Sequence, residues 1–187
     1  MQTPPLADQK SATRQSMLRQ LAALNGAEKH LASLSIVRQL HDWIIQHPEL
    51  ETIAIYAALP NEPQLEQLHH LAQGINFVYP LSHEHGEMHF HRVPTHSELS
   101  TGRFGILEPN PGHHPKVTPA NIDAFFCPGI AFSNDGKRIG KGGGYYDRIL
   151  ENRTPESHLI GVAFQCQITD ELPVETHDIK MDAVISA

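Results

Sequence analysis

The sequence contains few of the features that define several large classes of protein. It has two cysteines, Cys127 and Cys166, in 187 residues, too few for a disulfide framework, and both stand in apolar, strand-like runs, so we expect buried thiols in a reducing cytoplasm. No apolar run approaches the length of a membrane span, and residues 1–9 lack the hydrophobic stretch of a signal peptide. The formal net charge is −7 with histidine neutral, which gives no bulk attraction to nucleic acid or to an anionic membrane. We therefore expect a cytoplasmic protein that binds neither nucleic acid nor a membrane.

The length and composition indicate a single globular domain. A chain of 187 residues, 40% of them hydrophobic, is long enough to bury a sizeable core without dividing into several domains. We expect one domain over residues 1–187, with a flexible N-terminus at 1–9, where polar residues and two prolines precede the first periodic segment. No internal repeat is visible.

The spacing of apolar residues predicts helices that alternate with short strands. Helices are expected where apolar residues recur every three or four positions, at 10–24, from 26 to about 47, at 63–73 and at 145–150. Strands are expected in short apolar or β-branched runs, at 52–57, 76–81, 88–93, 122–127, 158–164 and 183–186. The strand at 88–93 alternates apolar and polar residues and is expected to be half exposed, and prolines predict an extended loop at 108–119. This alternation predicts an α/β fold, with helices on the faces of a sheet and a ligand crevice at the carboxyl ends of its strands.

The most informative segment is 135–148, Asp-Gly-Lys-Arg-Ile-Gly-Lys-Gly-Gly-Gly-Tyr-Tyr-Asp-Arg. Glycines allow the backbone to approach a ligand closely, so that several N–H groups converge on one anion, and neighbouring cations neutralise phosphate charge. The segment matches neither the Walker sequence nor the dinucleotide fingerprint Gly-x-Gly-x-x-Gly, and a flexible surface turn is the alternative. The three cations Lys137, Arg138 and Lys141, together with the closing Asp147, favour a site for a polyphosphate.

Histidine is unusually frequent, with 14 residues. His89 and His91 would share one face of a strand, a spacing that suits zinc. The other histidines that suggest a metal site are His83, His85, His113 and His114. No cysteine cluster and no His-Glu-x-x-His sequence accompanies them, so solvated histidines are the expectation.

Several short blocks of sequence, spread over nearly the whole chain, carry a family resemblance. They are Lys10–Arg14, Glu62, Phe104–Pro109, Pro128–Phe132, Arg138–Asp147, His177–Asp178 and Met181–Ile185. In the identity and order of these blocks the chain resembles the 5-formyltetrahydrofolate cyclo-ligase family, also called methenyltetrahydrofolate synthetases. The resemblance implies a Rossmann-like fold of three layers and a cytosolic enzyme that converts 5-formyltetrahydrofolate to 5,10-methenyltetrahydrofolate while it hydrolyses ATP to ADP and phosphate. It also implies Mg²⁺ as the cofactor and ATP and 5-formyltetrahydrofolate as the small-molecule partners. We expect a monomer.

The mechanism implied by the resemblance explains why such residues are needed. An amide oxygen is a poor leaving group, so ATP first phosphorylates the formyl oxygen. A neighbouring folate nitrogen then attacks the activated carbon, and phosphate departs as the ring closes. Phosphoryl transfer requires mainly positioning and charge neutralisation from the protein.

The resemblance also implies roles for the basic residues and the glycines. Lys10 and Arg14, four residues apart on one face of the first helix, are implied to contact ATP, and a solvated basic face is the alternative. Arg138 and Lys141 are implied to be the catalytic cations that reach the phosphate oxygens. The full set implied to contact ATP is Lys10, Arg14, Arg138, Ile139, Gly140, Lys141, Gly142, Gly143, Gly144, Tyr145 and Tyr146.

Acidic and aromatic residues are implied to bind the folate and the metal. Glu62 would bind the pterin, because a carboxylate can accept two N–H bonds from an aminopyrimidine edge; the alternative is a capping role for a helix that begins at Pro63. Tyr146 is favoured for ring contact with the substrate. Asp147 and Asp182 are implied to bind Mg²⁺, and the alternatives are an acid in a first helical turn and a turn residue before a strand.

Two other functions fit parts of the sequence. An enzyme of related architecture, such as a sugar-phosphate isomerase or a CoA transferase, would not need the Lys10–Arg14 pair together with the glycine segment and would not consume ATP. A non-catalytic module would bind a nucleotide without turnover, or would bind zinc through the histidines.

Overall fold

The computed structural model describes residues 4–83, 86–102, 105–175 and 178–187. His85, Phe104 and His177, which the sequence motifs include, lie outside the described residues. Within these ranges no helix combines the length and the hydropathy that a membrane crossing requires.

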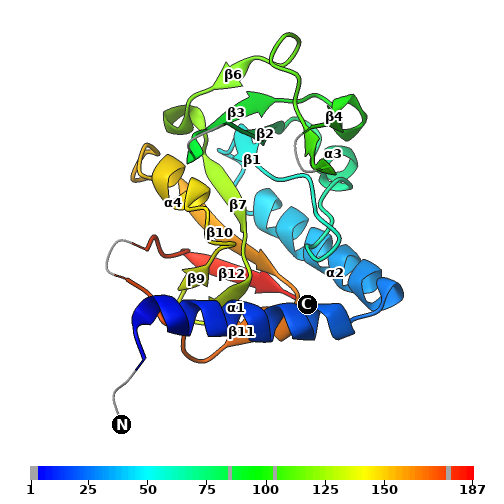
Figure 1. Ribbon diagram of the computed structural model, residues 1–187. Coiled ribbons are helices and arrows are strands. Elements are labelled where there is room, and N and C mark those ends of the chain that lie inside the picture. The colour runs from blue at the N-terminus through cyan, green and yellow to red at the C-terminus, as the bar shows by residue number, and fades with distance from the viewer. Residues whose placement is uncertain (1–3, 84–85, 103–104, 176–177) are drawn as a thin grey trace.

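The described part of the chain forms a central sheet of seven strands in the order β12-β10-β7-β1-β2-β3-β6 (Figure 1). In chain order these strands are β1 (Thr52–Ala54), β2 (Asn76–Ser82), β3 (Met88–Arg92), β6 (Lys116–Val117), β7 (Ala124–Pro128), β10 (His158–Ala163) and β12 (Ala183–Ser186). Adjacent strands from β12 to β2 pair in parallel, whereas β3 pairs antiparallel with both β2 and β6. The predicted α/β fold with a largely parallel sheet is confirmed.

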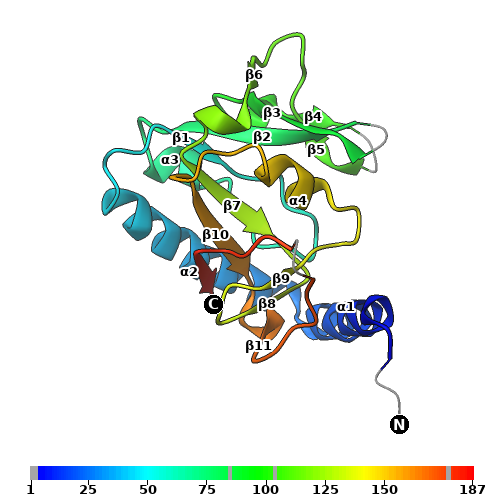
Figure 2. The ribbon, with the colours of Figure 1, turned by 90° about the vertical axis from the view of Figure 1, so that its left-hand side faces the viewer.

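Helices cover both faces of this sheet. The longer helices are α1 (Leu6–Ala23) and α2 (Gly26–Ile45), and the shorter ones are α3 (Leu68–Leu71) and α4 (Tyr145–Leu150). Successive side chains of a strand point to opposite faces, so Phe126 of β7 packs with Leu40 of α2, whereas Phe125 packs in a second core with Leu150 of α4. Figure 2 shows α2 and α4 on opposite sides of β7 and β10. The result is a fold of three layers.

Helix α2 begins at a capping box. The side chain of Asn25 accepts a hydrogen bond from the Glu28 N–H at 3.0 Å, and the Glu28 carboxylate accepts one from the Asn25 N–H at 2.8 Å. This arrangement satisfies two backbone donors that a helix start leaves open. It fixes the point at which the chain turns from α1 into the helix that covers the core.

Two smaller sheets complete the fold. One has the order β11-β8-β9 and consists of β8 (Ala131–Ser133), β9 (Arg138–Ile139) and β11 (Ile168–Thr169); the other pairs β4 (Ser100–Thr101) with β5 (Leu107–Glu108). Single 3₁₀ turns occur at His96–Glu98, Pro119–Asn121 and Gln165–Gln167. Met17 of α1 packs against Ala131 and Ile139, so the first helix is held next to the hairpin that leads into the glycine segment.

Two expectations for helices were wrong in part. Helix α1 begins at Leu6, so residues 6–9 are helical rather than flexible. The helix expected at 63–73 is reduced to α3, and the chain ahead of α3 is held by side-chain contacts. The Gln64 N–H donates to Ser33 Oγ at 3.1 Å, and the Leu59 N–H donates to Glu62 at 2.9 Å.

Two histidines are buried, contrary to the expectation that the histidines are solvated. His91 of β3 is 5% exposed and His114 is 3% exposed. His91 Nδ1 lies 2.8 Å from the backbone oxygen of His114, and His114 Nδ1 accepts the Asn110 N–H at 2.9 Å. These bonds replace the water that a buried imidazole loses. They also hold the 108–119 segment, expected to be a loop, against β3, where it contributes β6.

Candidate active site

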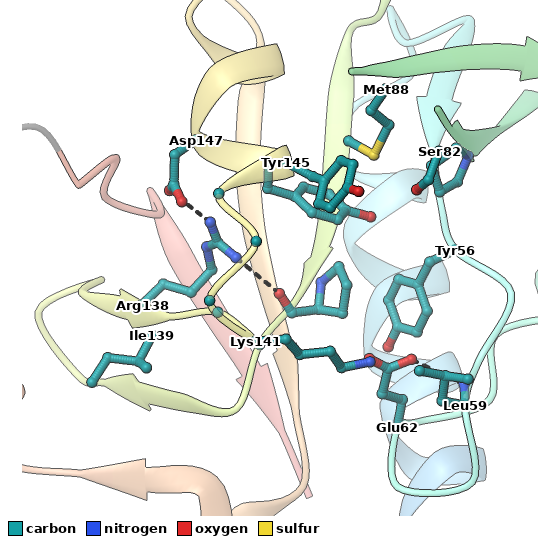
Figure 3. A pocket seen from close by; sticks show the side chains of 18 of the residues that line it. Tyr56, Leu59, Glu62, Ser82, Met88, Arg138, Ile139, Lys141, Tyr145 and Asp147 are labelled. Carbon is teal, nitrogen blue, oxygen red and sulfur yellow. Dashed lines mark hydrogen bonds and ion pairs between the residues drawn. The ribbon is translucent and has the colours of Figure 1, made fainter. Parts of the chain in front are cut away.

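A cavity of about 550 Å³ opens at the carboxyl ends of the central strands. Tyr56 and Ala57 line it after β1, Pro80 and Ser82 line it in β2, and Pro128 lines it at the end of β7. The opposite wall comes from α1 and from the glycine segment that precedes α4, and Figure 3 shows Lys141 of that segment facing Glu62. This is the place where open α/β sheets bind ligands, and the volume is in the range of small-molecule sites.

The glycine segment forms a continuous wall of this cavity. Residues 140–144 all line it. Gly142 has φ +103° and Gly144 has φ +64°, values that residues with a Cβ rarely adopt. The hairpin of β8 and β9, which the sequence analysis did not predict, leads into this segment and places Arg138 in a strand rather than in a loop.

Helix α1 brings Lys10 and Arg14 to the cavity, where both already have partners. Arg14 Nε donates to the backbone oxygen of Gly140 at 2.9 Å. Lys10 Nζ lies 2.7 Å from Glu175 Oε2 and 2.7 Å from Asp178 Oδ2. Burial disfavours the charged form of Lys10, but its hydrogen bonds to Asp178 and Glu175 outweigh that effect and raise its pKa. The alternative of a solvated basic face does not fit these contacts, since both side chains cross to other segments.

Arg138 is buried and points at Asp147. Its side chain is 3% exposed, and Nη2 lies 2.7 Å from Asp147 Oδ1 (Figure 3). Nη1 donates to the backbone oxygen of Pro128 at 3.3 Å, and the guanidinium carbon lies 5.5 Å from the ring centre of Tyr146. Arg138 thus joins the end of β7 to the first turn of α4, with one face on an aromatic ring.

Lys141 and Glu62 form an ion pair at the cavity wall. Nζ of Lys141 lies 2.5 Å from Oε1 of Glu62. The carboxylate of Glu62 also accepts the Leu59 N–H, and its side chain is only 7% exposed, against 49% for Lys141. A buried carboxylate with a half-exposed cationic partner can exchange that partner for a ligand donor. Glu62 does not cap a helix at Pro63, because the helix begins only at Leu68.

Asp182 contacts the sheet and not the cavity. Its Oδ2 accepts the Leu159 N–H at 2.7 Å, near the amino ends of β10 and β12, and it is not among the residues that line the cavity. Asp147 does line it. Among the described residues no group of three or more His, Cys, Asp or Glu side chains could hold a metal ion. The structure thus brings one of the two expected metal ligands to the site, and gives Asp182 the role of a turn residue before a strand.

Comparisons with known proteins agree on one family. The model of the 5-formyltetrahydrofolate cyclo-ligase family matches residues 7–187. The chain belongs to this family. A 5-formyltetrahydrofolate cyclo-ligase of Haemophilus influenzae is 31% identical over 166 residues, which cover 86% of this chain and 88% of that protein.

Two solved structures share the fold of this cyclo-ligase. The 5,10-methenyltetrahydrofolate synthetase of Aquifex aeolicus aligns with a TM-score of 0.82 and 29% identity, over 95% of this chain and 89% of that one. The synthetase of Mycoplasma pneumoniae aligns with a TM-score of 0.78 and 28% identity, over 94% of this chain and 97% of that one. The match to the family model, over residues 7–187, includes all the predicted site residues.

The two adjacent tyrosines of this cyclo-ligase have different surroundings. Tyr146 lines the cavity beneath Arg138, and burial raises the pKa of its hydroxyl well above the usual value. Tyr145 also lines the cavity, but its ring lies against Gly143 and 5.6 Å from the guanidinium carbon of Arg148. A Cβ on Gly143 would come within 2.7 Å of that ring, so the glycine is needed for this packing.

Sequence reasoning missed several side chains of the cavity wall, among them Tyr56, Leu59, Met88 and Glu108. Tyr56 stood in a run that was interpreted only as a core strand. The informative signal was its position at the carboxyl end of a parallel strand, where side chains face the crevice. Glu108 lies in a block that carries the family resemblance and is 8% exposed, but spacing alone indicated only a loop.

Proposed function

We propose that this cyclo-ligase converts 5-formyltetrahydrofolate and ATP to 5,10-methenyltetrahydrofolate, ADP and phosphate at the cavity between α1, the glycine segment and the ends of β1, β2 and β7. The observation that carries the assignment of this site is the convergence of four cations, Lys10, Arg14, Arg138 and Lys141, with a buried carboxylate, Glu62, in one cavity. A triphosphate requires the cations, and an aminopyrimidine requires the carboxylate.

The proposed reaction has two steps. The formyl oxygen attacks the terminal phosphorus of ATP, the bond from that phosphorus to the ADP oxygen breaks, and ADP leaves. The neighbouring folate nitrogen then uses its lone pair to attack the formyl carbon, its proton is lost, and the bond from that carbon to the phosphorylated oxygen breaks to release phosphate. The residues of the chain position the two substrates and neutralise the charge on the transferred group.

We propose that Arg138 and Lys141 are the cations closest to the transferred phosphoryl group. Arg138 is fixed by its bonds to Pro128 and Asp147, which suits a preorganised electrostatic contact. Lys141 is half exposed and free to swing from Glu62 to an incoming phosphate oxygen. Lys10 and Arg14, together with the N–H groups of residues 139–146, would hold the rest of the nucleotide.

Mg²⁺ fits Asp147 but not Asp182. Mg²⁺ is commonly held by one or two carboxylates together with substrate phosphates and water, and Asp147 offers one partly exposed carboxylate at the cavity. Asp182 fails the test because one of its oxygens accepts the Leu159 N–H outside the cavity. When bound, the ion would neutralise phosphate charge, while Asp147 keeps Arg138 in place.

We further propose that the protein acts as a monomer in the cytoplasm. Both cysteines are free thiols, as a reducing compartment favours. Gel filtration at working concentration tests the oligomeric state.

One assay tests the reaction. The protein is mixed with 5-formyltetrahydrofolate and Mg-ATP, and the absorbance of methenyltetrahydrofolate and the release of ADP are followed together. We expect methenyltetrahydrofolate and ADP in equal amounts. Neither product should form when 5-formyltetrahydrofolate or ATP is left out. Binding of ATP without turnover would favour the non-catalytic module, and cyclisation without ADP release would contradict the proposed phosphorylation.

A further inference from the structure

Tyr56 has a buried hydroxyl without a hydrogen-bond partner at the wall of the cavity. The residue is 4% exposed and lines the cavity. Within the described ranges its Oη has no hydrogen-bond partner. In Figure 3 the ring lies beside the cavity with its hydroxyl directed toward Glu62.

A second buried tyrosine provides the comparison. Tyr79, on the neighbouring strand β2, is 1% exposed, and its hydroxyl lies 3.0 Å from His69 Nε2. Tyr79 does not line the cavity. Of these two buried tyrosines, Tyr79 in β2 lies outside the cavity and has a partner within the protein, whereas Tyr56, just after β1, lies at the cavity and has none among the described residues.

An unsatisfied buried hydroxyl destabilises a fold, because the group loses water without gaining a partner. Phenylalanine would fill the same space without that cost, so the fold alone gives no reason for the hydroxyl. Burial, followed by the charge of Glu62, raises the pKa of Tyr56 well above the usual value. The group therefore remains a neutral phenol that can both donate and accept a hydrogen bond.

The neighbouring carboxylate does not meet this need. Glu62 already accepts the Leu59 N–H and pairs with Lys141. As an ionised carboxylate it offers acceptors only, so it recognises the N–H groups of a heterocycle but not its ring nitrogens or its carbonyl. A pterin presents both kinds of group along one edge. Tyr56 has the donor that Glu62 lacks.

We propose that the hydroxyl of Tyr56 donates a hydrogen bond to an acceptor on the pterin ring of the folate substrate, next to the N–H groups that Glu62 accepts. This contact makes Tyr56 a specificity-determining residue for the folate and not for the nucleotide. The inference rests on the proposed function, since it requires a pterin at Glu62.

The experiment compares Tyr56→Phe with the matched control Tyr79→Phe. For each variant, the KM values for 5-formyltetrahydrofolate and for ATP are measured, as is the melting temperature without substrates. For Tyr56→Phe we expect the folate KM to rise about 5- to 30-fold, as loss of one buried hydrogen bond predicts, with an unchanged ATP KM and an equal or higher melting temperature. For Tyr79→Phe we expect a lower melting temperature, because His69 loses its partner, with both KM values unchanged.

The readouts separate the possible failures. An unchanged folate KM in an active Tyr56→Phe variant would overturn the inference and leave the proposed function intact. A lower melting temperature with an unchanged folate KM would mean that the hydroxyl serves the fold only. Equal increases in both KM values would indicate a general distortion of the cavity and would also overturn it. Failure of the wild-type protein to cyclise 5-formyltetrahydrofolate would refute the proposed function itself, and the inference with it.

Discussion

Lys141 Nζ lies 2.5 Å from Oε1 of Glu62, so the cation that we assign to phosphate and the carboxylate that we assign to folate neutralise each other at the cavity. Either substrate has to break this pair to reach its own residue. Once ATP has drawn Lys141 away from Glu62, or folate has drawn Glu62 away from Lys141, the other substrate finds its own residue already unpaired. The geometry thus couples the two binding events through a single contact, without a change of fold.

Lys141→Met should weaken ATP binding selectively. The variant keeps the length of the side chain but loses the charge, and we expect the ATP KM to rise about 10- to 100-fold, because a charged hydrogen bond contributes about 1.5–3 kcal/mol. The folate KM should stay the same or fall, since Glu62 no longer has a competing partner. Lys137→Met is the control: Lys137 pairs with Asp135 at 3.1 Å and does not line the cavity. Equal effects of the two variants would contradict the assignment.

Glu62→Gln should have the opposite selectivity. The amide oxygen can still accept the Leu59 N–H, so the loop is retained, but the charge that attracts the pterin N–H groups is lost. We expect the folate KM to rise at least about tenfold, with little change in the ATP KM. Steady-state kinetics measure both KM values. The control variant is Glu66→Gln, because Glu66 is four residues away and lies outside the cavity. A folate KM equal to that of the wild type would remove Glu62 from the substrate site.

Asp147→Asn and Asp182→Ala should separate the metal role from the structural role. For Asp147→Asn we expect a higher Mg²⁺ concentration at half-maximal rate, because a carboxylate ligand is lost. For Asp182→Ala we expect an unchanged Mg²⁺ dependence and a loss of about 1 kcal/mol in the free energy of unfolding, since the Leu159 N–H loses its acceptor. Titration of activity with Mg²⁺ and denaturation with urea measure these effects. A shift in Mg²⁺ dependence for Asp182→Ala alone would reverse our assignment.

Gly142→Ala should reduce activity, although it adds only one methyl group. At φ +103° a Cβ introduces backbone strain of about 1–3 kcal/mol, and the segment can relieve it only by moving the wall of the cavity. We expect a higher ATP KM and a lower melting temperature. Gly26→Ala is the control, because it stands at the start of α2 with open space around a new Cβ, and it should leave activity unchanged and stability equal or higher. If Gly142→Ala and Gly26→Ala have the same kinetics, the backbone conformation at Gly142 does not shape the cavity for ATP.

Stability should decline in mild acid through His69. Burial lowers the pKa of His69 below 6.5, so the unfolded chain takes up a proton at a higher pH than the folded one does. The free energy of unfolding therefore falls as the pH drops through about 6.5. Urea denaturation at pH 7.5 and 5.5 should show this decline, and His69→Gln should reduce it. Part of the decline should persist, because the pKa of His89 is lowered too. An identical decline in the variant would exclude His69 as a contributor.

The parallel strands and the position of the cavity could be predicted from sequence because they depend on local patterns. Buried β-branched runs such as 52–57 and 158–164 specify strands, and the carboxyl ends of parallel strands specify where a ligand enters. The capped start of α2 is likewise local. The order of the strands in the sheet, with β1 between β7 and β2, depends on contacts between distant segments. The spacing of apolar residues along the sequence does not predict it.

The predictions that failed did so where tertiary contacts override local preference. Leucines at helical spacing favoured a helix at 63–73, but only Leu68–Leu71 is helical, and the chain before it is tied to Ser33 of α2 through the Gln64 N–H. His91 and His114 are polar, yet mutual packing and backbone bonds bury them. Asp182 stands in a block that resembles the family, but its carboxylate accepts the Leu159 N–H near the amino ends of β10 and β12, and it does not line the cavity. Composition could not reveal these outcomes, because each depends on a residue far away in the chain.

Lys10 contacts both Glu175 and Asp178, and this double contact should let the cavity distinguish charged nucleotides from neutral nucleosides. A polyanion can replace these carboxylates with oxygens of its own, so the lysine exchanges one set of counter-charges for another. A neutral nucleoside brings no such replacement and leaves the lysine where it is. Affinity along the series from adenosine to ATP should therefore climb with each added phosphate, whatever the base contributes.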